Sequence, residues 1–533
     1  MKIHEVSVRN FRSFDQFTAD LGGRSVITIG ENAGGKTALL TAIARALARD
    51  LVFTRADFRD PQQPIEVHVT LREFDVSQRG LFGNYIHFGQ PPHLVAGVRA
   101  VWDSAAESAE IEHGYPEHPG SRSRRDERDG VPLYWLPANR DPSRMLQFGA
   151  ERNLMASILR GLPIAQSLDQ AADDVRRASE RLGQDAALVG LLSDARDALS
   201  DLIPEVDANA YAIGLTGLTE RDLLRQFELH VEHFGPAVAV SRQSSGLSHL
   251  SLFVFAMALA AAQPGIILLV DEPELSLHPQ AQRALIRFLR KFDAQLILAT
   301  HSSNLLDRTD PRDVLRLKRG VGGAVDVVSP STLTDDEAHR LARHTTPHTA
   351  EAFFARTVVL VEGESDQFAL EVIADRLGRN LDGEGITIVP MGGATLIGTF
   401  LALFGPTGFQ LSVAGLCDEA EERYFLAGLQ RLGIQVQSRQ DMEREGFFVC
   451  VQDLEDELIR SIGTAVVVRI IDEHGDQAEF QRLQGQPAFQ GVSLDEQVRA
   501  FVKKHKVEYA PLLTDELDLA TIPRPLAELV AHL

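Results

Sequence analysis

A glycine-rich loop between a short apolar run and a run rich in alanine and leucine constrains this fold most. Residues 30–37 read GENAGGKT and match the pattern G-x-x-x-x-G-K-[ST] in full. The preceding run SVITI at 25–29 is typical of a buried strand, and KTALLTAIARALA at 36–48 is typical of a helix. This order directs backbone N–H groups and the positive end of a helix at an anion. The sequence therefore predicts a nucleotide phosphate site in an α/β domain.

Each position of this loop has a predicted role in holding ATP. Lys36 reaches the β- and γ-phosphates, and the Thr37 hydroxyl binds the accompanying Mg²⁺. Glycines allow consecutive backbone N–H groups to turn inward around an anion. The other loop residues that we expect to contact the nucleotide are Gly30, Asn32, Gly34 and Gly35.

A second motif, far along the chain, predicts the acidic partner of this loop. Residues 266–270, IILLV, read as an uninterrupted apolar strand that ends at Asp271 and Glu272. In the Walker B pattern, the first carboxylate after such a strand binds the Mg²⁺ of the nucleotide, and the adjacent one polarises the attacking water. We therefore predict that Asp271 binds Mg²⁺ and that Glu272 is catalytic in ATP hydrolysis.

The segment PELSLHP at 273–279 makes this part resemble the ABC-type ATPases of the SMC and RecF kind, which carry DEPE..LHP after Walker B. The resemblance implies that Ser245 and Gly246, in SSGLS before an apolar helix, belong to a degenerate signature loop. It also implies that His301, after the strand QLILA at 295–299, contacts the γ-phosphate and takes part in catalysis. A signature loop normally completes the site of an opposing subunit, so the resemblance implies a homodimer.

A helical insertion separates the two halves of the predicted ATPase. Apolar residues recur every three or four positions over 165–203, with Gly183 between two such runs, and this predicts a helical hairpin. Such arms often dimerise or grip a partner, and packing onto its own domain is the alternative. We expect the ATPase in residues 1–164 and 236–345, with the arm at 165–235 between them.

Composition excludes several classes of protein. Of the 533 residues, 44% are apolar and 24% are charged, which excludes a wholly disordered or collagen-like chain. The formal net charge is −22, so contact with DNA requires local basic patches or metal ions. The two cysteines lack metal-ligand spacing and fit a cytoplasmic protein. The apolar stretch at 251–270 is broken by Pro264 and Gly265, which favours a buried helix and strand over a membrane span.

The region from 350 to 533 alternates short apolar strands with helices, which predicts a parallel sheet with helices on its faces. Because such sheets carry their sites at the carboxyl ends of the strands, acidic residues there are candidate metal ligands. Hard cations such as Mg²⁺, Mn²⁺ or Ca²⁺ require carboxylate oxygens. The predicted ligands are Glu362 and Asp366 after the strand 357–361, Asp418 after 411–417, and Asp453 and Glu455 after 446–450.

The motifs VEGESD and GLCD make this region resemble a Toprim domain, the metal-binding module of topoisomerases, primases and some nucleases. With the ATPase half, the whole chain resembles the overcoming-lysogenization-defect (OLD) family of ATP-dependent nucleases. The resemblance implies two-metal cleavage of DNA, with Lys506 near the scissile phosphate. A solvated basic face shared with Lys503 and Lys504 is the alternative for Lys506. The implied biological setting is phage defence or DNA repair. The sequence does not identify an accessory helicase or another defence partner.

One departure from the Toprim pattern leaves an alternative function open. The second motif is usually D-x-D, and here Asp418 is followed by Glu419 and Ala420. Glu419 or Glu421 can substitute for the missing aspartate, although an acidic helix N-terminus is the preferred explanation of Glu421 and Glu422. The alternative is an ATP-switched, DNA-associated sensor or scaffold that does not cleave. A transporter ATPase fits poorly, because a Toprim-like half has no use in transport.

Overall fold

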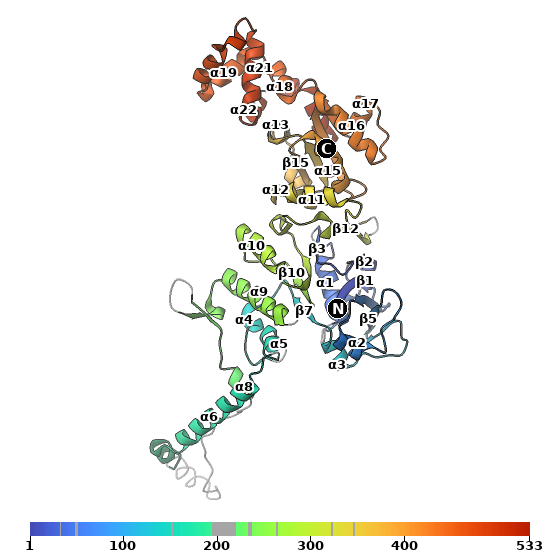
Figure 1. The fold of residues 1–533 in the computed structure, drawn as a ribbon, viewed down its shortest axis with the longest axis vertical. Helices are drawn as coiled ribbons and strands as arrows, with labels where there is room; N and C mark the ends of the chain where they lie inside the picture. Colours follow the sequence, from blue (N-terminus) through green and yellow to red (C-terminus); the bar gives the residue numbers. More distant parts are fainter. Residues whose placement is uncertain are drawn as a thin grey trace. The chain divides into compact units, whose positions relative to one another are not determined.

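The structure is a computed structural model, and Figure 1 shows its fold. It describes residues 1–31, 34–47, 52–150, 153–160, 162–193, 220–232, 237–262, 265–306, 308–320, 323–344 and 347–533. The chain forms two compact units: unit 1 comprises Met1–Leu133, Leu269–Pro273 and Gln295–Leu533, and unit 2 comprises Tyr134–Leu268 and Glu274–Ala294. The domain boundaries that the sequence suggested stay a prediction.

An antiparallel sheet with the strand order β2-β1-β4-β5-β6 forms the N-terminal part of unit 1. Buried and half-buried residues alternate along β4, which is the pattern of a strand with one face on a core. Helix α1 (Lys36–Leu47) packs on β4 and β5, so this sheet supports the helix that follows the glycine loop. The strands are β1 (Lys2–Phe11), β2 (Phe14–Asp20), β4 (Ile65–Arg72), β5 (Leu94–Asp103) and β6 (Ser108–Gly114); the short helices are α2 (Val76–Phe82) and α3 (Arg125–Asp129).

A second sheet carries the predicted nucleotide motifs. Strand β3 pairs in parallel with β11 on one side and with β12 on the other, and β10 follows β11. Every residue of β3 and β10 is buried, as is usual for strands covered on both faces. The ends of β3, β10 and β11 therefore present their following loops at one edge. The strands are β3 (Val26–Gly30), β10 (Ile266–Asp271), β11 (Ala294–Ala299), β12 (Val314–Arg319) and β13 (Val325–Val328).

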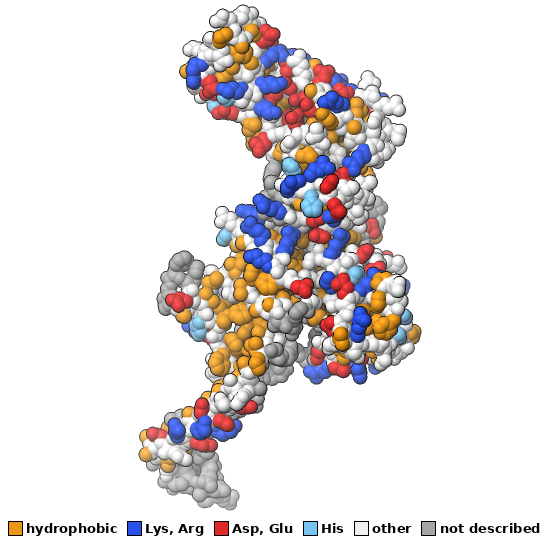
Figure 2. Space-filling model, in the orientation of Figure 1, with side chains coloured by type: hydrophobic (Ala, Val, Ile, Leu, Met, Phe, Trp, Pro, Cys, Tyr) orange, Lys and Arg blue, Asp and Glu red, His pale blue; other side chains and the backbone are white. Residues whose placement is uncertain are grey.

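Unit 2 is mainly helical, and α9 (Ser245–Ala262) packs on α4 and α5. Hydrophobic side chains gather over the helices of unit 2 on the face shown in Figure 2, and Val254 of α9 is 52% exposed. Among the described residues, no helix has the length and apolar character needed to cross a membrane. The other elements are β7 (Leu133–Leu136), α4 (Pro142–Met145), α5 (Leu154–Arg160), α6 (Ala165–Gly183), α8 (Glu220–Leu224), β8 (His230–Val231), β9 (Val238–Ala239) and α10 (Pro279–Leu289).

The predicted helical arm is described only in part. Helix α6 (Ala165–Gly183) corresponds to the first helix of the predicted hairpin, and a helical stretch at 186–193 begins the second. The remainder of the predicted hairpin, from 194 to 203, lies outside the described residues. Its role in dimerisation therefore stays a prediction.

A parallel sheet with the order β15-β14-β16-β17 forms the core of the C-terminal part of unit 1. The three strands whose ranges the sequence predicted lie within one residue of those ranges, and the predicted α/β fold class is confirmed. The elements are α11 (Asp335–His344), α12 (Pro347–Glu351), β14 (Thr357–Val361), α13 (Glu364–Arg376), α14 (Leu381–Glu384), β15 (Ile386–Pro390), α15 (Ile397–Phe404), β16 (Ser412–Asp418), α16 (Glu422–Arg431), α17 (Arg439–Arg444), β17 (Phe447–Cys450) and α18 (Leu454–Ile462).

Five further helices complete this core and bring Lys506 to the sheet. Helix α22 packs along α13, and the buried ring of Tyr509 joins the same hydrophobic core as Val361 and Leu370. Arg376 of α13 donates one hydrogen bond to the carbonyl of Thr514 in α22, which further links the two helices. The helices are α19 (Thr464–His474), α20 (Gln477–Gln484), α21 (Leu494–Lys504), α22 (Lys506–Asp515) and α23 (Arg524–His532).

Candidate functional site

A pocket of about 390 Å³ in unit 1 gathers the predicted nucleotide residues from three segments. The glycine loop forms one side, the residue after β10 forms the second, and the loop after β11 forms the third. Arg12, from the turn between β1 and β2, completes the wall. The lining residues are Arg12, Ser13, Gly34, Gly35, Lys36, Thr37, Ala38, Glu272 and His301.

The glycine loop has a conformation that side chains would prevent. Gly30 has φ +147°, and a Cβ there would lie 2.5 Å from the carbonyl oxygen of Leu317 on β12. Gly35 has φ +102°, in the left-handed range that favours glycine. Lys36 Nζ donates to the carbonyl oxygens of Gly30 at 2.9 Å and Glu31 at 3.0 Å, so the amine is held over the loop. Asn32, predicted to contact the nucleotide, lies outside the described residues.

The acidic side of this pocket lies at the end of β10. Asp271 is 1% exposed, and the Glu272 N–H donates to the Ala299 carbonyl at 2.8 Å, which joins the ends of β10 and β11. Glu272 has φ +47°, a strained value for a residue with a side chain and one that is common at functional sites. Burial, and then the charge of Lys36, lower the pKa of His301, which favours the neutral imidazole. These positions fit the predicted roles, which stay predictions.

The predicted signature residues lie in unit 2. Ser245 and Gly246 are the first two residues of α9, and Ser248 donates its hydroxyl to the Val240 carbonyl at 2.9 Å. A Cβ at Gly246 would lie 3.0 Å from the carbonyl oxygen of Ser276. The close backbone approach explains a glycine here, and its part in a signature loop stays a prediction.

Carboxylates gather at the carboxyl ends of three strands of the C-terminal sheet. Glu362 and Asp366 follow β14, Asp418 ends β16, and Glu455 lies in the first turn of α18 after β17. The Gly363 N–H donates to Asp366 Oδ2 at 2.9 Å. These residues lie at the strand ends because parallel strands end at the same edge of a sheet, and their role as metal ligands stays a prediction.

The surroundings of these carboxylates oppose their ionisation. Burial, followed by the charges of Glu455 and Glu362, raises the pKa of Asp366 to about 7. Burial, followed by Asp366 and Glu455, raises the pKa of Asp418 to about 8. Burial is also the main cause that raises the pKa of Glu455, and Lys506 partly opposes it. A divalent cation would reverse these shifts by offsetting the negative charges.

The residues present fit a hard divalent cation. Glu455 is 5% exposed, and its Oε1 atom is buried without a hydrogen-bond partner. Glu362, Asp418 and Glu421 each offer one oxygen, and these three atoms lie within 4.8 Å of one another. Oxygen-only donors of this kind suit Mg²⁺ or Mn²⁺. Glu421 is absent from the predicted ligand set, because an acidic helix N-terminus was the preferred explanation of this residue. The signal that could have identified it is Ala420, which stands where the Toprim pattern has an aspartate.

Asp453 has structural partners for both of its carboxylate oxygens. It is the N-cap of α18, with Oδ1 accepting from the Asp456 N–H at 2.9 Å, and its Oδ2 lies 2.9 Å from Lys503 Nζ. Lys504 pairs with Glu479 at 2.7 Å. The three lysines therefore have different surroundings, and Lys506 is the one whose charge acts on both Asp366 and Glu455.

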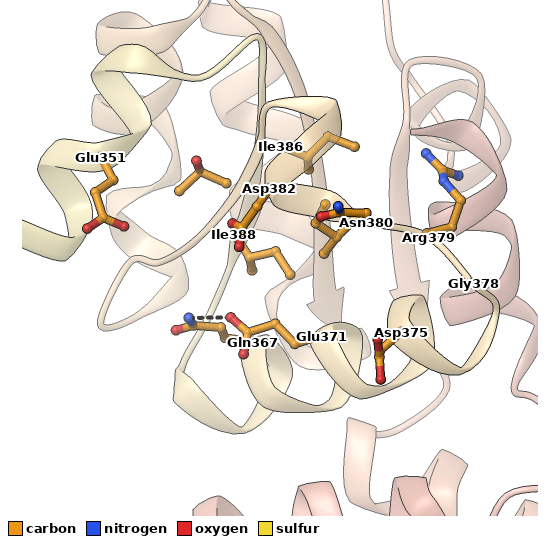
Figure 3. A pocket seen from close by; sticks show the side chains of 12 residues that line it. Glu351, Gln367, Glu371, Asp375, Gly378, Arg379, Asn380, Asp382, Ile386 and Ile388 are labelled. Carbon is orange, nitrogen blue, oxygen red and sulfur yellow. Dashed lines mark hydrogen bonds between the residues drawn. The ribbon is translucent and has the colours of Figure 1, made fainter. Parts of the chain in front are cut away.

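A separate groove of about 630 Å³ lies beside the edge strand β15 (Figure 3). Glu351, Glu371, Asp375 and Asp382 line it, and the Gln367 amide donates to Glu371 at 2.7 Å. It contains none of the predicted ligands or catalytic residues, so its size does not make it the candidate site.

Two family models match the two parts of the chain. Residues 29–307 match the model described as "AAA domain, putative AbiEii toxin, Type IV TA system", which covers more than half of the chain. Residues 353–419 match "Overcoming lysogenization defect protein-like, TOPRIM domain". The chain belongs to the OLD family. Its AAA domain match contains the glycine loop, Glu272 and His301 of the pocket, and its OLD-like Toprim match contains Glu362, Asp366 and Asp418 and ends at residue 419. The predicted resemblance is thus confirmed.

Three relatives extend this finding. The chain is 25% identical over 427 residues to the OLD nuclease of Thermus scotoductus, covering 73% of this chain and 77% of that protein. It is 22% identical over 433 residues to the endonuclease GajA of Bacillus cereus, covering 74% and 71%. It is 32% identical over 124 residues to the protein YbjD of Escherichia coli, covering 23% of this chain and 22% of that protein. The similarity therefore extends over most of the first two proteins and about a fifth of the third.

Two solved structures are also similar to parts of the chain. The C-terminal region of the Burkholderia pseudomallei OLD protein aligns with a TM-score of 0.28 and 21% identity, covering 34% of this chain and 97% of that one. The SMC head domain from Thermotoga maritima aligns with a TM-score of 0.31 and 14% identity, covering 62% of this chain and 99% of that one.

Proposed function

We propose that this OLD-family protein is a divalent-metal-dependent DNA endonuclease whose ATPase domain controls assembly or access to DNA. The observation that carries the proposal is the convergence of Glu362, Asp366, Asp418 and Glu455 from three strand ends. The names of two relatives, OLD nuclease and endonuclease GajA, support the same activity. The biological setting that we propose is defence against foreign DNA, with DNA repair as the second candidate.

The Toprim residues have distinct roles in this proposal. Two divalent ions bound by these carboxylates would stabilise the attacking and leaving oxygens of a phosphodiester. Asp366 and Asp418, with pKa values raised to about 7 and about 8, lose their protons as they take up cations. Lys506 donates to a non-bridging oxygen of the scissile phosphate and offsets its charge. The cations and Lys506 together allow DNA to approach a chain with a net charge of −22.

The nucleotide pocket is proposed to bind ATP with Mg²⁺. Lys36 and the loop N–H groups hold the phosphates, and Thr37 and Asp271 hold the Mg²⁺. Glu272 polarises the attacking water, and the neutral His301 contacts the γ-phosphate. We further propose a homodimer in which Ser245 and Gly246 complete the partner's site, which the exposed apolar face of α9 around Val254 supports.

Nicking of supercoiled plasmid with Mg²⁺ or Mn²⁺ tests the endonuclease. We expect Glu362→Gln to lower the nicking rate roughly 100-fold, because it removes a ligand charge from the pocket. Glu364→Gln is the matched control, since this exposed glutamate lies two residues away and outside the ligand group. Equal nicking by the wild type and Glu362→Gln contradicts the proposal.

A second candidate function is an ATP-switched scaffold on DNA that does not cleave. Ala420, at the position of the second aspartate of D-x-D, favours it. It predicts no cleavage with any divalent metal, together with a change in DNA binding or dimerisation in Glu272→Gln. Gel shift and light scattering with ATP distinguish it from the endonuclease.

A further inference from the structure

Three glutamates follow Asp418 within four residues, and they have different partners. Arg439 Nη2 lies 3.2 Å from Glu419 Oε1 and 2.6 Å from Glu422 Oε2. Arg439 Nε lies 3.1 Å from the same Glu422 oxygen. Glu421 instead groups with Glu362 and Asp418. Glu419 and Glu422 therefore pair with Arg439, and Glu421 belongs to the carboxylate pocket.

The backbone explains this division. Residues Glu419–Glu421 form a 3₁₀ turn that begins at Asp418. In such a turn, side chains three residues apart lie on the same side. Glu419 and Glu422 therefore share one side, where Arg439 meets both, and Glu421 lies on another side, near Asp418 and Glu362.

A second feature of the carboxylate pocket indicates that a cation belongs there. Glu455, whose charge acts on Asp418, is 5% exposed and has a buried Oε1 atom without a hydrogen-bond partner. The charges of Asp366, Glu455 and Glu362 all act on Asp418. Buried carboxylates at this spacing repel one another unless they share protons or cations.

We infer that Glu421 is a metal ligand, and that with Glu362 and Asp418 it holds one of two divalent ions. Asp366 and Glu455, whose charges both act on Asp418, would hold the other ion. Ala420 has no carboxylate, and the turn lets Glu421, one residue later, supply the missing oxygen. Glu421 lies beyond the matched Toprim residues 353–419, so the family match does not assign it. The inference rests on the proposed function in one respect: the Toprim pocket must bind divalent metal.

Mn²⁺ binding to the full-length protein tests the inference directly. Electron paramagnetic resonance of free Mn²⁺, recorded without nucleotide, gives the number and affinity of bound ions. We expect Glu421→Gln to lose one ion or to weaken one site about 10- to 100-fold. The matched control Glu422→Gln, whose wild-type side chain pairs with Arg439, keeps the wild-type count. Unchanged Mn²⁺ binding in Glu421→Gln overturns the inference, and a circular dichroism melt shows that each variant is folded.

Plasmid nicking by the same variants separates this inference from the proposed function. Loss of one ion in Glu421→Gln, together with an inactive wild type, supports the ligand and contradicts the endonuclease. Nicking that depends on Glu362 while Glu421→Gln binds Mn²⁺ normally contradicts the ligand and supports the endonuclease. A wild type that binds no Mn²⁺ in the Toprim pocket contradicts both.

Discussion

The nucleotide pocket and the carboxylate pocket of unit 1 differ in how their charged side chains are stabilised. In the nucleotide pocket, the amine of Lys36 already has partners, the carbonyl oxygens of Gly30 and Glu31. In the carboxylate pocket, Asp366 and Asp418 have raised pKa values because burial and mutual repulsion oppose their charges. The first pocket is organised by its own backbone, and the second becomes fully compatible with ionised side chains only with a cation. We therefore expect the two pockets to respond differently to mutation and to pH.

Mutation of Lys36 should have a greater effect than the other changes, because we propose that this side chain supplies the positive charge of the nucleotide pocket. Lys36→Ala should lower ATP hydrolysis about 100- to 1000-fold, because it removes the charged donor to the phosphates. Release of inorganic phosphate measures the rate. The exposed Lys291 provides the control, and Lys291→Ala should hydrolyse ATP at the wild-type rate. Similar rates in the two variants would show that Lys36 does not have this role.

A smaller effect is expected on the affinity of the carboxylate pocket for Mn²⁺, which should depend on pH. Asp366 and Asp418 hold protons at pH 6 that a cation must displace; by pH 8.5 Asp366 is largely ionised and Asp418 has passed its midpoint of about 8. The affinity for Mn²⁺ should therefore rise about tenfold or more between pH 6.5 and 8.5. Titration calorimetry at the two pH values measures it. A flat profile contradicts the raised pKa values, and in Asp418→Asn the rise should be smaller.

The smallest effect concerns stability. The pKa of Asp418 is raised to about 8 in the folded protein, so the stability associated with its protonated form is lost as the pH rises toward 8. Asp418→Asn removes that loss and retains an oxygen for the Leu454 N–H. Without divalent metal, its unfolding midpoint at pH 8.5 should exceed that of the wild type by about 2–4 °C, and at pH 4 the two should agree.

The matched control for this measurement is Asp375→Asn, at an exposed position on α13. Its midpoint should follow the wild type at both pH values. A gain in Asp418→Asn that persists at pH 4 would point to packing rather than charge as its cause.

Features encoded in contiguous residues were predictable from the sequence. Strand β14 has the predicted bounds, and the glycine loop, β10 and β11 come together at one edge as expected. These features depend on local periodicity and on the rule that parallel strands end at the same edge.

The partners within the carboxylate pocket were less predictable. Asp453 follows a strand as a metal ligand does, but an acidic helix cap has the same pattern, and its oxygens contact the Asp456 N–H and Lys503. The sequence does not distinguish the roles of Glu421 and Glu422. The structure does, because Arg439, 17 residues beyond Glu422, pairs with Glu422. Sequence spacing does not encode which carboxylate a distant arginine meets.

The position of the Lys36 amine has a consequence for nucleotide affinity. Phosphate oxygens entering the pocket compete for this amine with two carbonyl groups of the loop itself. Hydrogen bonds to a charged group contribute about 1.5–3 kcal/mol each, so the loop acts as an internal competitor of ATP. The measured affinity for ATP then reflects the difference between the bonds of Lys36 Nζ to the phosphates and its bonds to the loop carbonyls. Changes in the loop backbone can therefore alter this affinity without contacting the nucleotide.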